Sequence, residues 1–148
     1  LIPSILSCHF ITKKNIIDIG AGSGICGIPI KLMRDEIKLL ICEKNNKKIA
    51  FLNHVILELD IKNVEIIQYS LENSPINTLQ NVEQLLIRGI KLVDIYKTLI
   101  SKFPRGTDLI YFGRINEVDR LDVKLIDKLA MPGNDRRQTP LFIFLLRL

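Results

Sequence analysis

The sequence predicts an α/β fold of the Rossmann-like type, with a mostly parallel sheet and helices on both of its faces. Short apolar runs rich in β-branched residues alternate with segments of helical periodicity, which is the pattern of a parallel sheet. A glycine-rich turn at 20–24 separates the first apolar run from a helical segment. Polar residues stand directly after several apolar runs, where the carboxyl ends of parallel strands bind ligands.

The first half of the chain is predicted to hold three strands and the helices between them. Residues 1–10 are apolar and are expected to be the end of a helix whose beginning is absent. Pro29 is tolerated because it falls in the first turn of a helix. The predicted order is a strand at 16–19, a helix at 28–33, a strand at 38–42, a helix at 45–60 and a strand at 64–69.

The second half continues the alternation of strands and helices. Pro104 and Gly106 mark the end of one helix and a turn. Leu121, Leu125 and Leu129 are spaced to face inward together on an amphipathic helix. The predicted order is a strand at 84–87, a helix at 90–103, a strand at 107–112, a helix at 116–130, a polar loop at 131–140 and a last strand at 141–146.

The composition is that of one globular domain. Of the 148 residues, 47% are hydrophobic and 25% charged, so the chain can bury a core and disorder is not expected. No apolar run reaches the roughly 20 residues of a membrane span, and Cys8, Cys26 and Cys42 lack the paired spacing of a metal site. The net charge of +5 permits a polyanionic partner. We expect a cytoplasmic monomer that uses neither a metal nor a membrane.

The glycine turn points to a cofactor. Glycine lets a backbone approach a ligand closely or adopt positive φ, and the helix start that follows offers free N–H groups. In Gly20-x-Gly22-x-Gly24 the third glycine comes one residue too early for the dinucleotide fingerprint, and Gly27 does not restore the spacing. With Asp18 on the preceding strand, the pattern is that of methyltransferases that use S-adenosylmethionine. The alternative is a structural turn of an ordinary α/β domain.

Further residues are predicted to meet the turn at the same edge of the sheet. Glu43 ends the second strand nineteen positions after Gly24, where nucleotide-binding α/β domains bind ribose hydroxyls. A carboxylate accepts hydrogen bonds from both vicinal hydroxyls, and the alternative is a surface acid that caps the next helix. Leu71 and Glu72 are expected to flank an adenine, and Arg88 ends the fourth strand. This convergence is a stronger argument than any single motif.

Two segments, DIGAGSGICGIPI at 18–30 and EKNNKKIAFL at 43–52, resemble the RsmG (GidB) family, the bacterial 16S ribosomal RNA guanine-N7 methyltransferases. The sequence DIGAGSGICGIPI at 18–30 is similar to the family's first motif, and its Gly-Ile-Pro-hydrophobic tail carries most of the specificity. The sequence EKNNKKIAFL at 43–52 is similar to the family's second-strand acid and paired basic residues. The resemblance is close over about 16–72 and weakens afterwards, where LIRG at 86–89 looks like the family's Ser-Arg-Ala.

The chain also departs from the family pattern. Ile25-Cys26 stands where the family usually has Phe-Pro, and Ile87 replaces a Ser or Thr. The family's N-terminal helices are mostly absent, and the region after Gly113 is short. We therefore expect a truncated or divergent member, with a single class I methyltransferase domain over residues 1–148.

The resemblance implies transfer of a methyl group from S-adenosylmethionine to N7 of a guanine in 16S ribosomal RNA, with that RNA or the small ribosomal subunit as the partner. N7 carries a lone pair in the ring plane, so in-line positioning suffices without a general base. Arg88 is expected at the methyl-transfer end as the catalytic residue. The expected cofactor-binding residues are Asp18, Gly20, Gly22, Gly24, Ile25, Glu43, Leu71, Glu72 and Arg88. The candidates for contacts with RNA phosphates are Lys47, Lys48, Arg136 and Arg137.

Two other interpretations stay open. The cofactor half alone is compatible with a methyltransferase that acts on a small molecule or a protein. A truncated or degenerate relative can also keep the fold without activity. His54 falls in the predicted helix at 45–60 and is interpreted as a surface or half-buried residue and not as a catalyst.

Overall fold

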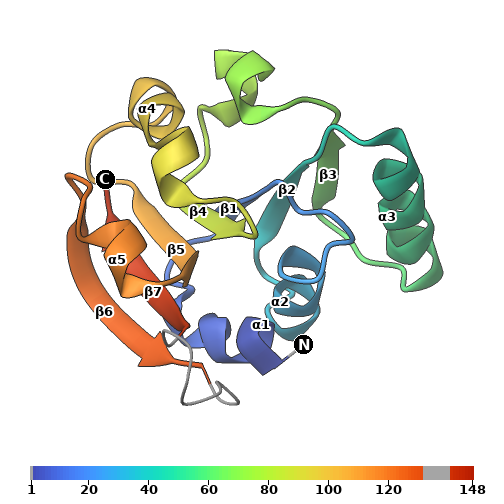
Figure 1. Ribbon diagram of the computed structural model, residues 1–148. Helices are drawn as coiled ribbons and strands as arrows, with labels where there is room; N and C mark the ends of the chain where they lie inside the picture. The colour runs from blue at the N-terminus through green and yellow to red at the C-terminus, as the bar shows by residue number, and fades with distance from the viewer. Residues whose placement is uncertain (1, 132–140) are drawn as a thin grey trace.

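A mixed sheet forms the centre of the molecule (Figure 1). The computed structural model describes residues 2–131 and 141–148, and the strands named here lie within them. They are β1 (Asn15–Ile19), β2 (Lys38–Cys42), β3 (Val64–Ile67), β4 (Gln84–Arg88), β5 (Asp108–Gly113), β6 (Lys124–Ala130) and β7 (Phe142–Arg147). Their spatial order is β3-β2-β1-β4-β5-β7-β6. Strands β1 to β5 run parallel, whereas β7 lies antiparallel to both β5 and β6.

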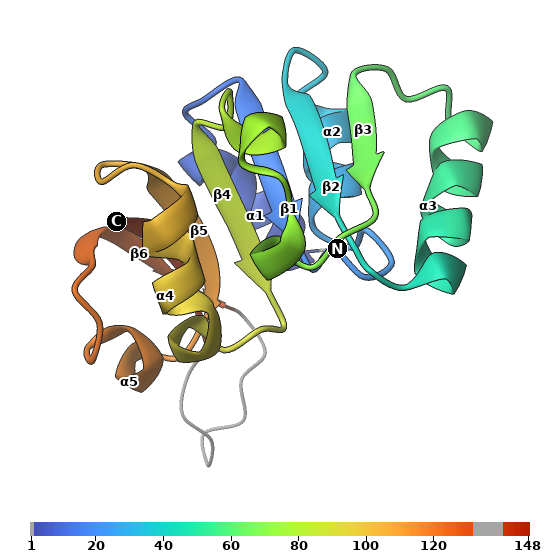
Figure 2. The ribbon, with the colours of Figure 1, turned by 90° about the horizontal axis from the view of Figure 1, so that it is seen from above.

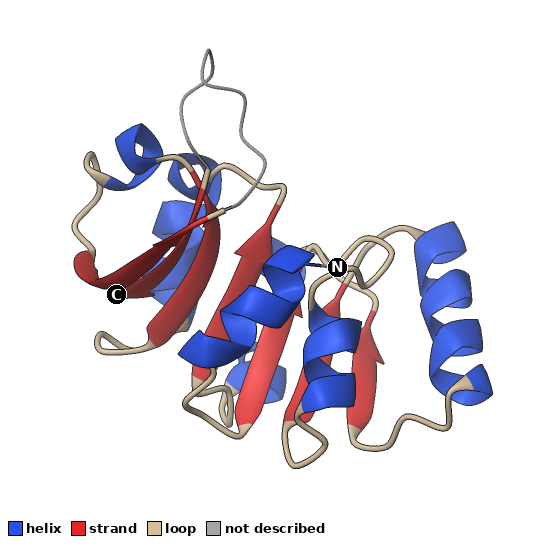
Figure 3. Cartoon of the chain, turned by 90° about the horizontal axis from the view of Figure 1, so that it is seen from below, coloured by secondary structure: helices blue, strands red, loops and turns tan. Residues whose placement is uncertain are grey.

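Helices cover both faces of this sheet. They are α1 (Ile2–Ser7), α2 (Gly27–Met33), α3 (Asn46–Glu58), α4 (Leu92–Lys102) and α5 (Ile115–Val118), with the short 3-10 turns η1 (Cys8–Phe10), η2 (Leu71–Asn73) and η3 (Ile76–Leu79). Figures 2 and 3 show α1 and α2 on one face and α4 on the other, with α3 beside the edge strand β3. The predicted α/β class is confirmed. A search of residues 2–131 and 141–148 finds no helix that combines the length and the hydropathy of a membrane span.

An apolar core lies on each face of the sheet. Ile17 and Leu85 pack with α4 on one side, and Ile16 and Leu86 pack with α2 on the other. Successive residues of a strand point to opposite faces, and here both faces are buried, which explains the nearly continuous apolar runs. Burying one such side chain stabilises the fold by about 1.5–3 kcal/mol.

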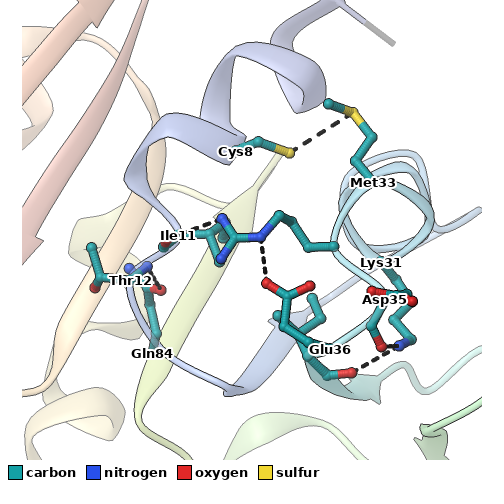
Figure 4. Close-up of polar contacts among 10 residues, drawn as sticks. Cys8, Ile11, Thr12, Lys31, Met33, Asp35, Glu36 and Gln84 are labelled. Atoms are coloured by element: carbon teal, nitrogen blue, oxygen red, sulfur yellow. Dashed lines mark hydrogen bonds and ion pairs between the residues drawn. The ribbon is translucent and has the colours of Figure 1, made fainter.

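The segment between α1 and β1 is fastened to β4 and to the end of α2 (Figure 4). The buried Gln84 donates from Nε2 to the Phe10 carbonyl at 2.8 Å, and its Oε1 accepts from the Thr12 amide at 3.2 Å. Arg34 donates to the Ile11 carbonyl at 3.4 Å. These bonds fix the place of α1 beside α2, beneath the glycine turn.

The predicted helix at 116–130 is wrong. Only Ile115–Val118 is helical there, and Lys124–Ala130 forms the strand β6. This strand pairs with β7, with Leu125 opposite Leu146. The leucine spacing is helical, but a bulge between Leu125 and Asp127 turns Leu125 and Leu129 to opposite faces of the sheet, opposite Leu146 and Ile143 of β7. Pairing with the backbone of β7 overrides the local helical preference, and the lysines of β6 are typical of an exposed sheet edge.

The other predicted elements are present with shifted ends. The third strand ends at Ile67 and not at residue 69, and the helix expected from residue 90 begins at Leu92. The last strand, expected at 141–146, is β7. The polar loop predicted at 131–140 lies outside the described residues except for its first.

Candidate functional site

A cleft of about 720 Å³ opens at the carboxyl ends of β1, β2 and β4. Its walls are the glycine turn between β1 and α2 and the residues that follow β2, β3 and β4. A volume of this size suits a ligand as large as a nucleotide. All of the predicted cofactor residues except Gly24 line it, namely Asp18, Gly20, Gly22, Ile25, Glu43, Leu71, Glu72 and Arg88.

A second hollow, of about 840 Å³, lies at the opposite edge of the sheet, where β1, β2 and β3 begin. Its lining includes Asn15, Lys38, Asn63 and Glu83, and it contains none of the predicted site residues. We place the candidate site in the smaller cleft. Ligands of parallel sheets bind at the carboxyl ends of the strands, and the glycine turn lies at that edge.

The glycine turn is shaped for close approach of a ligand to the backbone. Gly20 and Gly22 have φ of +67° and +62°, a region that residues with a Cβ rarely adopt. The Gly20 amide donates to the Cys42 carbonyl at 2.8 Å, which ties the turn to the end of β2. A Cβ on Gly22 would meet Lys48 Nζ only at 3.8 Å. The space above Gly22 is therefore open to a ligand.

Gly24 serves packing within the fold. A Cβ at this position would lie 2.6 Å from Leu52 Cδ2 and 2.7 Å from Ile28 Cγ1. Gly24 is buried and is not part of the cleft lining. The absence of a side chain lets α3 pack close to the turn. A contact between Gly24 and a cofactor stays a prediction.

Glu43 joins the turn to the start of α3. Its Oε2 accepts from the Gly22 amide at 2.8 Å, and its Oε1 accepts from the amides of Lys44 and Asn45, both at 2.9 Å. Burial by itself would raise the pKa of this carboxyl. The three amide hydrogen bonds and the nearby Lys48 favour the charged form more strongly, so the net effect is a lowered pKa. Glu43 is thus ionised. It holds the two residues that precede α3, whose N-cap is Asn45, and its Oε2 keeps a lone pair for a ligand hydroxyl in the cleft.

Asp18 lies beneath the turn and is 1% exposed. Its Oδ2 accepts from the Gly27 amide at 2.8 Å, at the start of α2. Burial raises the pKa of Asp18 to about 7, although the Gly27 amide and Arg88 act in the opposite direction. A buried carboxyl of the cleft therefore titrates near neutral pH.

The side chains of Arg88 and Asp18 point to the same face of the sheet. The strand register places Asp18 opposite Leu86, and Arg88 stands two residues further along β4. Its Nη1 donates to Cys26 Sγ at 3.7 Å, and its guanidinium carbon lies 5.8 Å from the centre of the Phe112 ring. Asp18, Cys26 and Arg88 thus form one wall of the cleft.

The loop after β3 forms another wall. Leu71 is buried and Glu72 is exposed at the start of η2, and the Cys42 thiol donates to the Tyr69 carbonyl at 3.2 Å. Tyr69 and Ser70 also line the cleft, and neither is among the predicted site residues. The signal that could have found them is their position at the end of the predicted third strand, 64–69, where Tyr69 is its last residue and Ser70 follows it.

The predicted basic residues do not share one environment. Lys48 lines the cleft, whereas Lys47 is exposed and is not part of the lining. Lys44 lines the cleft as well and was not predicted. Arg136 and Arg137 lie outside the described residues. Within the described ranges, no group of three or more His, Cys, Asp or Glu residues is arranged to hold a metal ion.

The order of the sheet and the position of the cleft define a class I methyltransferase fold, as predicted. Solved structures agree. TYW2 from P. horikoshii in complex with MeSAdo is similar with a TM-score of 0.78 and 14% identity, over 99% of this chain and 61% of that one. TrmK from M. capricolum in complex with S-adenosyl-homocysteine is similar with a TM-score of 0.75 and 11% identity, over 99% and 68% of the two chains.

The chain belongs to the GidB family, described as rRNA small subunit methyltransferase G, whose model matches residues 1–124. The resemblance seen in the sequence is thereby confirmed. Ribosomal RNA small subunit methyltransferase G of Legionella pneumophila (strain Corby) is 40% identical over 139 residues, which cover 86% of this chain and 66% of the relative. The protein of that name from Borreliella burgdorferi (strain ZS7) is 29% identical over 121 residues, which cover 80% and 56%. The chain thus spans about two thirds or less of these relatives.

Proposed function

We propose that this chain binds S-adenosylmethionine and transfers its methyl group to N7 of a guanine in 16S ribosomal RNA. Membership of the family supports this reaction class. The observation that carries the proposal is the hydrogen bond between Glu43 and the Gly22 amide. This bond brings Glu43 and the glycine turn together on one side of an open cleft. Glu43 suits ribose hydroxyls, and the turn lets a ligand approach the backbone closely.

The cleft offers a partner for each part of the cofactor. Glu43 is proposed to accept from the ribose hydroxyls, and Leu71 and Glu72 to border the adenine. The methionine part would then extend along the wall of Asp18 and Arg88. There the Asp18 carboxylate would attract the ammonium group of the cofactor, and the Arg88 guanidinium would attract its carboxylate. Arg88 remains the proposed catalytic residue, because a guanidinium at that end can also pair with a guanine edge or a phosphate.

The proposed reaction needs positioning and no general base. Bound S-adenosylmethionine supplies an electrophilic methyl group on a sulfonium. N7 of guanine attacks with a lone pair in the ring plane while the sulfur–methyl bond breaks, its electron pair stays on sulfur to leave S-adenosylhomocysteine, and the positive charge passes to the guanine, so no proton has to leave. The chain's two histidines, His9 and His54, are exposed and do not line the cleft, so neither is in place to remove a proton. The proposed contribution of the cleft is to hold the two reactants in line.

Basic residues beside the cleft are proposed to contact the RNA backbone. Lys47 and Lys48 stand exposed in the first turn of α3, although a helix dipole disfavours cations there. A polyanion bound across the rim would compensate this cost. Arg136 and Arg137, which lie outside the described residues, are proposed to contact RNA phosphates because of the sequence alone. The partner would be 16S ribosomal RNA or the small subunit, and a monomeric state stays a prediction.

Isothermal titration calorimetry with S-adenosylmethionine tests the cofactor site. Glu43→Ala is expected to weaken binding by about tenfold or more, because it removes the ribose acceptor and releases the Gly22 amide. Glu65→Ala is the matched control, since Glu65 is exposed and lines the opposite hollow. No binding heat for the wild type, or equal affinities for wild type and Glu43→Ala, would refute the proposed site.

A second experiment separates the RNA substrate from a small molecule or a protein. Mass mapping of ribosomal RNA from a strain that lacks the gene is expected to show loss of one N7-methylguanosine from 16S ribosomal RNA. Re-expression of the wild type should restore it, and re-expression of Glu43→Ala should not. An unchanged content of this nucleoside in the deletion strain would remove the RNA proposal and leave the cofactor proposal standing.

A further inference from the structure

Helix α1 reaches the glycine turn through one buried hydroxyl. Ser4 is 0% exposed, and its Oγ donates to the Ile25 carbonyl at 2.6 Å. The two residues are 21 positions apart, so this contact joins separate elements of the fold. Ile25 lines the cleft and is 47% exposed, and its neighbour Cys26 contacts Arg88.

The sequence explains why the Ile25 carbonyl needs this donor. In a regular helix, a carbonyl accepts from the amide four residues later, but residue 29 is a proline and has no N–H. Helix α2 begins at Gly27, and its N-cap residue Cys26 makes no side-chain cap bond. The Ser4 hydroxyl therefore takes the place of the missing amide and satisfies the carbonyl at the start of the helix.

Helix α1 is a firm support for this contact. Beyond Ser4, the Cys8 thiol lies 3.9 Å from the Met33 sulfur near the end of α2, as Figure 4 shows. The chain that follows α1 is bonded to the buried Gln84. Because the segment that directly follows α1 is held at these points, the end of α1 is anchored, and Ser4 can fix the Ile25–Cys26 peptide and, through Cys26, the contact with Arg88.

We propose that Ser4 is a positioning residue for the cofactor, acting through the Ile25 carbonyl on the wall of the cleft that receives the methionine part. This inference rests on the proposed function. Ser4 does not itself line the cleft, so its effect passes through the turn. Loss of its hydroxyl frees the Ile25–Cys26 peptide and loosens that wall, while the adenosine end near Glu43 keeps its own bonds.

The chain supplies a matched control on the same helix. Ser7 is also 0% exposed, and its Oγ donates at 2.7 Å to the Ser4 carbonyl, a bond within α1. Ser4→Ala and Ser7→Ala each remove one buried hydroxyl and one hydrogen bond to a carbonyl. Only Ser4→Ala releases the turn.

The experiment compares the wild type with both variants by calorimetry, using S-adenosylmethionine and 5′-methylthioadenosine, which lacks the amino and carboxylate groups. Ser4→Ala is expected to weaken S-adenosylmethionine binding about five- to tenfold, and Ser7→Ala to stay within about twofold of wild type. Both variants should bind 5′-methylthioadenosine as the wild type does. Without ligand, amide hydrogen exchange at Gly24–Ile28 should accelerate in Ser4→Ala and not in Ser7→Ala.

Thermal unfolding of each variant verifies that it is folded. If Ser4→Ala does not fold, Ser4→Cys replaces it, because a thiol of similar size is a weaker donor and should give an intermediate loss of affinity. Equal affinity of the Ser4 variant and the wild type for S-adenosylmethionine overturns this inference and leaves the proposed function intact. An equal loss for both ligands, or for both serine variants, assigns Ser4 to stability alone. If the wild type does not bind S-adenosylmethionine, the proposed function is overturned, and the role of Ser4 is overturned with it.

Discussion

Asp18 and Gly27 close the glycine turn, because the Asp18 carboxyl accepts a hydrogen bond of 2.8 Å from the Gly27 amide. One residue belongs to β1 and the other is the first of α2. A Cβ on Gly27 would lie 2.7 Å from Asp18 Oδ2, so the bond also needs a glycine at this position. The strand, the turn and the helix are thereby held as one unit under the cleft.

The buried Asp18 makes stability depend on pH. Its pKa is raised from 3.8 to about 7 in the folded chain, so the protonated form is favoured on folding. The resulting stability is fully present below about pH 4 and is lost as the pH rises through about 7. The free energy of unfolding should fall by up to roughly 4 kcal/mol over this range. Urea unfolding of the unliganded wild type and of Asp18→Asn at about pH 5 and pH 8 measures the effect.

Asn at position 18 keeps an acceptor for the Gly27 amide without a charge. Asp18→Asn should therefore be more stable than the wild type at the higher pH and show a flatter pH dependence. The same substitution should weaken S-adenosylmethionine binding, because the proposed partner of the ammonium group is lost. A variant whose pH dependence matches that of the wild type would contradict the assignment of this titration to Asp18.

The glycines of the turn are predicted to divide into ligand and packing positions. Gly24→Ala should lower the free energy of unfolding by about 2–4 kcal/mol, because its Cβ overlaps Leu52 and Ile28 at positive φ. Gly22→Ala should cost only about 1–2 kcal/mol for its φ, yet reduce S-adenosylmethionine affinity more strongly, since its Cβ enters the cleft. Urea unfolding and calorimetry of both variants check this. If both variants lost the same S-adenosylmethionine affinity for each kcal/mol of lost stability, Gly22 and Gly24 would not have separate roles.

Lys47 and Lys48 are predicted to differ in their effects. Lys48 lines the cleft and helps keep the pKa of Glu43 low, so Lys48→Ala should weaken binding of S-adenosylmethionine and of RNA. Lys47→Ala should weaken RNA binding alone. For each variant the slope of log affinity against log salt should decrease by about one. Filter binding to a 16S ribosomal RNA fragment at several salt concentrations provides the measurement, with the exposed Lys62→Ala as the control. An unchanged slope for Lys47→Ala would remove that residue from the RNA surface.

Much of the site was predictable because it depends on local rules. A parallel sheet gathers its strand ends at one edge, so the turn at 20–24, Glu43 and Arg88 had to meet there once the strands were recognised. The cleft lining confirms that they do. The apolar runs of β1 and β4 were equally clear, because both of their faces are buried.

The features that escaped prediction depend on contacts between distant segments. The pairing of Lys124–Ala130 with β7 cannot be read from the leucine spacing, which is typical of a helix, whereas the strand contains a bulge between Leu125 and Asp127. The packing role of Gly24 depends on Leu52, which lies far along the chain on α3. The bond from Ser4 to the Ile25 carbonyl joins two segments that carry no common motif.

We propose that loops from several strands enclose an adenosyl group at the carboxyl edge of the sheet. Titration of S-adenosylmethionine into the ¹⁵N-labelled chain, followed by amide chemical shifts, tests it most directly. The largest changes are expected at Gly20, Gly22, Asn45 and Glu72. Changes concentrated at Asn15, Asn63 and Glu83 around the opposite hollow, or no changes at all, would contradict it.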